Sequence, residues 1–185
     1  MNEKIIFNIA NINRCTTAEG PYKRLAIWFQ GCDILCKNCC NEQLQQFIPA
    51  NIVCIEDLVE IITQSKLEFD IEGITLLGGE PTLQTKSLIH LCKKVKSMGL
   101  GIILFSGILR HQISTELLSN VDLLIDGPYI DSKKEKIRPW VGSINQKFHY
   151  LTSHYNNSIE NKSHRNVNIN VGNTVLFNGD VILNL

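Results

Sequence analysis

The sequence predicts an α/β fold, a small and partial (β/α) barrel that carries a C-terminal β-hairpin appendage. Short apolar runs alternate with segments of helical periodicity up to about residue 150. Strands that alternate with helices pair in parallel through right-handed crossovers. The runs are almost uninterrupted, which fits a sheet buried on both faces. Functional residues of such folds follow the C-terminal ends of the strands.

The elements of the barrel follow one another without an obvious linker. Strands are predicted over residues 25–29, 73–77, 100–105 and 121–125, and helices over residues 55–66, 84–98 and 111–120. The first helix carries Leu58, Ile61 and Ile62 at helical spacing, with acidic residues near its start, where the helix dipole favours them. Gly99 is expected to end the second helix, because glycine readily adopts the left-handed conformation found there.

The C-terminal part has a different pattern. Residues 156–166 are polar and predict a loop. Residues 168–171 and 174–177 alternate around Gly172 and Asn173, which predicts a hairpin. We therefore divide the chain into a barrel domain over residues 1–151 and an appendage of loop and hairpin over residues 152–185.

Composition and charge restrict the function classes. The chain has 18 Lys plus Arg and 18 Asp plus Glu, and the resulting zero net charge does not support a surface for nucleic acid or anionic membrane. No charged leader with a long apolar run and no bilayer-spanning stretch is found. Seven cysteines, several of them clustered, indicate metal binding in a reducing compartment. We therefore expect a cytoplasmic protein that binds neither nucleic acid nor membrane.

The cysteine cluster is the most specific chemical signal. Cys32, Cys36 and Cys39 have the spacing Cys-x3-Cys-x2-Cys in a loop directly after a predicted strand. Three such thiolates can hold three irons of a 4Fe–4S cluster and leave the fourth iron open. The alternative is a zinc knuckle, but zinc usually takes two separated ligand pairs and a second Cys-x2-Cys pair is absent. The roles of Cys40, a neighbouring fourth thiol, and of Cys15 stay open.

Further candidate residues follow the predicted strands. They are Gly78, Gly79 and Glu80, then Ser106, then Asp126. The two glycines permit close approach of the main chain, and a strand end exposes carbonyl groups. Ser106 can bind a ligand or act as an ordinary turn residue. Asp126 ends a buried strand, so its carboxylate needs a partner, and an Asx-turn or a helix cap is the alternative.

Arg24 and the five histidines carry weaker signals. Arg24 can pair with a carboxylate, cap the cysteine loop or lie on the surface. The five histidines show no metal-ligand spacing. No side chain is therefore assigned a catalytic role from the sequence.

The motifs resemble the radical S-adenosylmethionine (SAM) superfamily, because the three cysteines are followed by Leu-Gly-Gly-Glu-Pro at residues 77–81. More narrowly, the chain resembles the small glycyl-radical activating enzymes of the anaerobic ribonucleotide reductase type. The supporting segments are residues 19–24, 28–32, 103–107, 121–129 and 140–146. The chain departs from that pattern at Asn38 and Cys40, where relatives often carry glycine and an aromatic residue, and at Tyr22, which replaces a second glycine.

The resemblance implies a radical SAM oxidoreductase with a 4Fe–4S cluster and SAM as cofactors. It implies that Gly78, Gly79 and Glu80 bind the SAM amino group, that Ser106 bonds its ribose or carboxylate, and that Asp126 helps to hold a cation. Flavodoxin or ferredoxin would reduce the cluster, and the 5′-deoxyadenosyl radical would abstract hydrogen from a glycine Cα of a partner enzyme. Residues 143, 145 and 146 resemble a family signature that shapes the site.

Two other functions remain open on sequence grounds. One is a stand-alone radical SAM enzyme that modifies a peptide or small molecule, which the residues around Cys39 and the hairpin favour. The other is a non-enzymatic metal or redox protein, which leaves the Gly-Gly-Glu-Pro segment unexplained. The sequence does not specify the substrate, the oligomeric state or the role of the hairpin.

Overall fold

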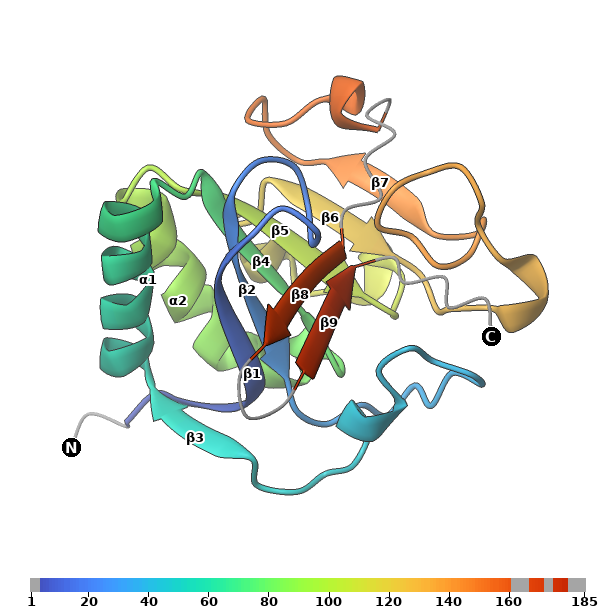
Figure 1. The fold of residues 1–185 in the computed structure, drawn as a ribbon, viewed down its shortest axis with the longest axis horizontal. Coiled ribbons are helices and arrows are strands. Elements are labelled where there is room, and N and C mark those ends of the chain that lie inside the picture. Colours follow the sequence, from blue (N-terminus) through green and yellow to red (C-terminus); the bar gives the residue numbers. More distant parts are fainter. Residues whose placement is uncertain (1–3, 161–166, 172–174, 180–185) are drawn as a thin grey trace.

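The structure is a computed structural model, and it describes residues 4–160, 167–171 and 175–179 (Figure 1). A seven-stranded sheet in the order β3-β1-β2-β4-β5-β6-β7 runs through these residues. The four central strands are parallel: β2 (Arg24–Phe29), β4 (Gly73–Gly78), β5 (Gly101–Ser106) and β6 (Leu123–Asp126). The outer strands pair antiparallel: β1 (Ile6–Thr16), β3 (Asn51–Cys54) and β7 (Lys147–Tyr150).

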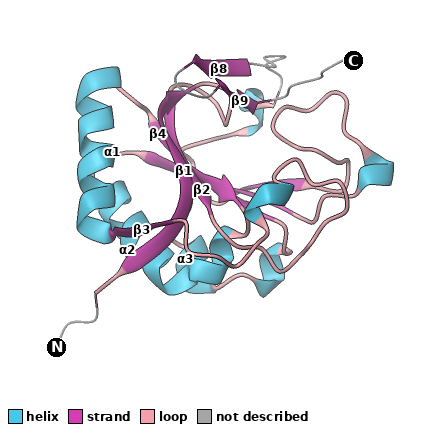
Figure 2. Ribbon diagram, turned by 60° about the horizontal axis from the view of Figure 1, so that its bottom comes forward, coloured by secondary structure: helices cyan, strands magenta, loops and turns pink. Residues whose placement is uncertain are grey.

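The helices pack on one face of the sheet (Figures 1 and 2). They are α1 (Ile55–Phe69), α2 (Thr85–Ser97) and the short α3 (Thr115–Leu118). Helix α2 connects β4 to β5, and α3 lies between β5 and β6, so each joins two parallel strands. Gly99 follows α2 with a φ of +73°, and a Cβ atom there would meet nothing within 4 Å, so the left-handed conformation accounts for glycine and confirms the expected helix end.

The side chains of the parallel strands alternate between two faces. Ile27, Leu76 and Leu104 pack against the helices in the main core. Their neighbours in the chain, Trp28, Leu77 and Phe105, lie together on the opposite face. Both faces of the sheet are therefore covered by apolar residues, which explains why the sequences of these strands are nearly continuous apolar runs.

The α/β fold predicted from the sequence is confirmed, and the four parallel strands lie where they were predicted, to within a few residues. Three strands were not predicted, because β1 carries polar residues on a partly exposed face and β3 and β7 are short edge strands. The helix predicted over residues 111–120 is shorter than expected. A 3₁₀ turn precedes it, and Ser114 caps α3 by accepting a hydrogen bond from the Leu117 amide.

The C-terminal strands β8 (Val167–Val171) and β9 (Val175–Gly179) pair antiparallel in a separate two-stranded sheet. The predicted turn at Gly172 and Asn173, and residues 161–166 of the predicted loop, lie outside the described residues. Residues 152–160 pack on the main sheet, since Thr152 bonds Asp122 and Tyr155 is buried. None of the described helices is both long and apolar enough to cross a membrane.

Arg24 is fully buried at the N-terminal end of β2. Its guanidinium donates to Thr75 Oγ1 at 2.8 Å and to the Tyr155 hydroxyl at 2.8 Å, and it forms an ion pair with Glu72 at 2.5 Å. Pairing with a carboxylate was one of the three roles predicted for Arg24, and it is confirmed. The predicted surface position is wrong, because Tyr155 and the neighbouring strands cover the side chain.

We expect Arg24→Ala to lower the free energy of unfolding by about 3 kcal/mol, because it leaves Glu72 and Thr75 without their buried partner. The matched control is Arg14→Ala. Arg14 pairs with Glu68 on the surface, where such a pair contributes less than about 1 kcal/mol. Urea unfolding followed by circular dichroism measures both variants, and equal losses would contradict the anchoring role of Arg24.

Candidate functional site

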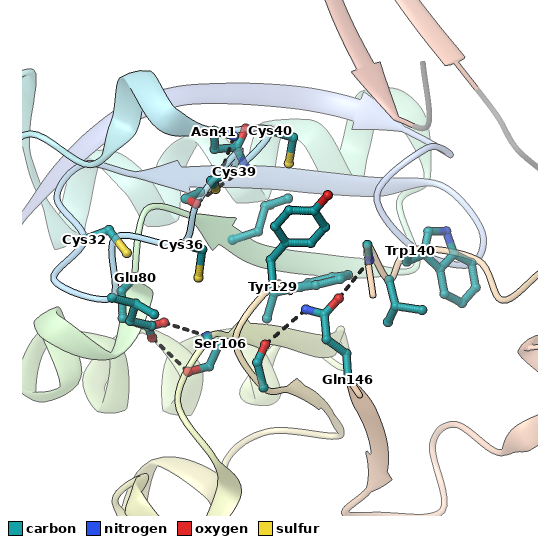
Figure 3. Close-up of a pocket in the computed structure, with 18 of the residues that line it drawn as sticks. Cys32, Cys36, Cys39, Cys40, Asn41, Glu80, Ser106, Tyr129, Trp140 and Gln146 are labelled. Carbon is teal, nitrogen blue, oxygen red and sulfur yellow. Dashed lines mark hydrogen bonds between the residues drawn. The ribbon is translucent and has the colours of Figure 1, made fainter. Parts of the chain in front are cut away.

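A pocket of about 1180 Å³ opens at the C-terminal ends of the parallel strands (Figure 3). Trp28, Leu77 and Phe105 line it from the sheet face that the helices leave uncovered. The cysteine loop lines one side, and residues 127–146, which follow β6, line the other. The pocket therefore combines an apolar floor with polar rims, as ligand sites commonly do.

The cysteine loop begins where β2 ends. Gly31 has a φ of +96°, and the Cys32 amide donates to the Gln45 carbonyl at 3.1 Å. The Cys39 amide donates to the Cys36 carbonyl at 3.3 Å, which closes the second half of the loop. The thiols of all three cysteines are free, and all three residues line the pocket.

The three thiols differ in acidity. Burial raises the pKa of Cys32 and of Cys36. A hydrogen bond from the Cys40 side chain lowers the pKa of Cys39 to about 6, and the Asn41 amide adds a bond to its sulfur at 3.4 Å. The lowered pKa favours the thiolate of Cys39, the form that binds metals, while a metal must displace protons from the other two thiols.

The donor set fits a 4Fe–4S cluster. Among the described residues, no three His, Cys, Asp or Glu side chains converge on one metal-ion position. A cluster gives each cysteine its own iron, so the three thiols can lie apart along the wall of one pocket, as they do here. Thiolates from Cys32, Cys36 and Cys39 would hold the cluster, and Cys40 also lines the pocket beside Cys39.

The segment from Gly78 to Glu80 lies directly beside the cysteine loop. The Gly79 amide donates to the Phe29 carbonyl at 2.9 Å, and the Glu80 amide donates to the Gly31 carbonyl at 2.8 Å. A Cβ atom at Gly79 would lie 2.2 Å from the Gly31 carbonyl oxygen. Glycine is required here because two main chains approach within contact distance.

The Glu80 carboxylate is buried, and donors from the protein occupy it. It accepts hydrogen bonds from the Thr82 amide and hydroxyl, from the Ser106 hydroxyl at 2.9 Å and from the Gly107 amide at 2.8 Å. These bonds tie the end of β4 to the end of β5. The SAM-binding roles predicted for Glu80 and Ser106 stay predictions, and their side chains bond each other in this structure.

Asp126 ends β6 at the same edge of the sheet but does not line the pocket. Its buried carboxylate accepts a hydrogen bond from the Arg110 amide at 2.6 Å and contacts His149 Nε2 at 2.9 Å. The next residue, Gly127, does line the pocket. The structure thus brings the three cysteines, Gly78, Gly79, Glu80 and Ser106 together, and the predicted cation-binding role of Asp126 stays a prediction.

The loop after β6 adds pocket residues to which the sequence assigned no role. Tyr129 and Trp140 line the pocket, and Trp140 has a φ of +63°. Gln146 holds this loop, since its Oε1 accepts from the Gly142 and Ser143 amides and its Nε2 donates to the Gly127 carbonyl (Figure 3). The sequence signals for this wall were the aromatic residues within the recognised segments and the resemblance of residues 143, 145 and 146 to a site-shaping signature.

Comparisons with known proteins agree with this geometry. A family model described as "4Fe-4S single cluster domain" matches residues 18–149. The pyruvate formate-lyase-activating enzyme of Clostridium pasteurianum is 28% identical over 130 residues, which are 69% of this chain and 55% of that protein. The chain thus spans about half the length of that relative.

Two other relatives match over most of their length. The anaerobic ribonucleoside-triphosphate reductase-activating protein of Haemophilus influenzae is 29% identical over 140 residues, 70% of this chain and 89% of that one. The protein of the same name from Enterobacteria phage T4 is 28% identical over 145 residues, 76% of this chain and 92% of that one. The crystal structure of QueE from Escherichia coli has a similar fold, with a TM-score of 0.52 at 15% identity, and the match covers 68% of this chain and 61% of QueE.

We expect Glu80→Gln to lower the free energy of unfolding by about 2 kcal/mol, because an amide nitrogen replaces one of the two acceptor oxygens. Ser106→Ala removes one donor to the same carboxylate, and we expect it to lower the free energy of unfolding by about 1 kcal/mol. Urea unfolding of the cluster-free protein measures both. A Glu80→Gln variant as stable as the wild type would contradict the structural role of this carboxylate.

Proposed function

Because the chain belongs to the 4Fe-4S single cluster domain family, we propose that it is a radical SAM enzyme that installs a glycyl radical on a partner protein. One observation carries the proposal: three free thiols at Cys32, Cys36 and Cys39 line the same pocket as the Gly78–Glu80 strand end. The names of the relatives support the reaction, since each is described as an activating enzyme or protein.

The chain's own residues supply binding and protection in this proposal. Cys32, Cys36 and Cys39 would hold the cluster, and the main chain at Gly78 and Gly79 would lie beside SAM. When bound, the cluster and SAM supply the reductive cleavage that yields methionine and a 5′-deoxyadenosyl radical. The apolar floor of the pocket excludes water from the reacting groups, which limits side reactions.

The partner proposed is a glycyl-radical enzyme, with anaerobic ribonucleotide reductase favoured. The chain covers about nine-tenths of the two reductase-activating proteins but only about half of the pyruvate formate-lyase-activating enzyme. The pocket volume of about 1180 Å³ exceeds that of an ordinary small-molecule site, which leaves room for a segment of a partner beside SAM. Flavodoxin or ferredoxin is proposed as the electron donor.

The proposal also includes the division of the chain into a barrel and an appendage, and the compartment in which the protein works. We read residues 1–151 as a partial radical-SAM-type barrel and residues 152–185 as its appendage. The open sheet with a pocket on its helix-free face supports the first part, and the separate β8–β9 sheet supports the second. The cytoplasm is the proposed compartment, because all seven cysteines are free.

A stand-alone radical SAM enzyme is the second candidate. Asn38 and Cys40 favour it, since both stand beside Cys39 and form part of the pocket lining. In that case a peptide or small molecule, rather than a protein partner, donates the hydrogen atom.

We expect Cys36→Ala to reduce 5′-deoxyadenosine formation by more than about 100-fold, because even residues that only support cluster ligands contribute 10- to 100-fold. The protein is reconstituted anaerobically with iron and sulfide, reduced with dithionite and mixed with SAM. Cys54→Ala is the matched control, since Cys54 does not line the pocket and full activity is expected. Zinc binding without a cluster would refute the proposal.

We also expect deoxyadenosine formation to rise about tenfold or more when anaerobic ribonucleotide reductase is added, because a positioned hydrogen donor makes the step effectively intramolecular. Electron paramagnetic resonance (EPR) should then detect a glycyl radical on the reductase. Pyruvate formate-lyase, tested in parallel, shows whether the partner assignment is correct. Turnover that no protein partner stimulates, but that a peptide stimulates, would favour the stand-alone enzyme.

A further inference from the structure

The two loops that border the pocket are joined at Asp131. Asn38, in the cysteine loop, donates from Nδ2 to Asp131 Oδ2 at 2.9 Å. Tyr129 donates its hydroxyl to Asp131 Oδ1 at 2.9 Å, and Lys134 pairs with the same oxygen at 3.3 Å. Residues 38 and 131 are 93 positions apart in the chain, so this contact links two segments that the sequence keeps separate.

Asn38 lies between two of the proposed cluster ligands in an unusual backbone conformation. Its φ is +57°, in the left-handed region that asparagine tolerates better than most residues. This conformation belongs to the turn closed by the bond from the Cys39 amide to the Cys36 carbonyl. The hydrogen bond to Asp131 restrains Asn38 within that turn, and thereby restrains the cysteines on both sides.

Tyr129 supports the same contact from the Asp131 side. Its hydroxyl donates to Asp131 Oδ1, and Tyr129 lines the pocket together with Cys36 and Asn38. Its ring also packs against Gly142, where a Cβ atom would lie 2.9 Å from Tyr129 Cδ2. Residues 129–131 therefore bond the cysteine loop through Asp131, and Tyr129 holds the carboxylate that makes this contact.

The loop that carries Asp131 is itself restrained. Arg138 pairs with Glu135 at 2.7 Å and donates to the carbonyls of Gln146 and Ile144. The Ile144 amide donates to the Lys133 carbonyl at 2.8 Å. Asp131 thus offers the cysteine loop a restrained anchor rather than a free side chain.

We propose that Asp131 is a positioning residue that, through its bond to Asn38, fixes Cys36 and Cys39 for the cluster and slows loss of iron from it. We call this contact the Asn38–Asp131 clasp. The inference rests on the proposed cluster site and deepens it. Partners that orient metal ligands contribute about 10- to 100-fold to metal retention. Asn38 is exposed, so we expect the contribution of the clasp to lie near the tenfold end of that range.

The main competing explanation is that residue 38 matters only for its left-handed backbone. Asn38→Gly separates the two explanations, because glycine adopts that conformation without strain but has no side chain to bond Asp131. Asp131→Ala removes the other half of the clasp. Asp131→Asn keeps an oxygen acceptor for Asn38 and is the conservative variant expected to restore most of the effect.

The experiment measures two properties of the full-length protein. Hydrogen exchange of residues 33–41 in the iron-free protein reports the order of the loop. Release of iron to a chelator from the reconstituted protein, together with the EPR spectrum of the reduced cluster, reports how the ligands are held. Asp33→Ala is the control, because Asp33 lies exposed in the same loop and its loss removes the same charge.

We expect Asn38→Gly and Asp131→Ala each to speed iron release by about tenfold and to broaden the EPR spectrum. We expect the double variant to release iron no faster than either single variant, because both substitutions remove the same contact. Hydrogen exchange of residues 33–41 should accelerate in Asn38→Gly and in Asp131→Ala. The exchange and iron-release rates of Asp33→Ala and Asp131→Asn should stay near those of the wild type. An Asn38→Gly variant that behaves like the wild type would overturn the clasp. If the wild type forms no cluster, the proposed function fails, and loop exchange alone still decides whether the clasp orders the loop.

Discussion

The site depends on one close approach of two main chains at the C-terminal edge of the sheet. The segment after β4 continues the pairing with β2 beyond the end of the strands, so that Gly79 lies against the Gly31 carbonyl. Only glycine allows this spacing. As a result, the Gly-Gly-Glu segment and the cysteine loop, far apart in the sequence, form one wall of one pocket.

Two buried ionic groups hold the opposite edges of the parallel strands. Arg24 binds Glu72, Thr75 and Tyr155 at the N-terminal edge. The Glu80 carboxylate binds the ends of β4 and β5 at the C-terminal edge. Buried charges require such partners. Thr75 of β4 and Ser106 of β5 belong to the neighbouring strands, so each group also aligns the strands that build the pocket.

The opposite wall of the pocket comes from the loop after β6, and it depends on side chains rather than on strand pairing. Gln146 and Arg138 hold the loop by bonding its own carbonyls and amides. Asp131 then joins it to the cysteine loop. Order in one loop therefore depends on order in the other, which relates the geometry of the thiols to a segment distant in the chain.

The sequence by itself determined the α/β class, the parallel strands and the three cysteines, because these depend on residues close together in the chain: apolar periodicity and short thiol spacing. Only the tertiary structure showed the antiparallel edge strands, the burial of Arg24 and the hydrogen bonds that Glu80 accepts from Ser106 and Gly107. It also decided that Asp126 faces Arg110 and His149 and that Asn38 meets Asp131. Those outcomes depend on which distant side chains the folded sheet brings within hydrogen-bond distance, and local sequence patterns do not encode that proximity.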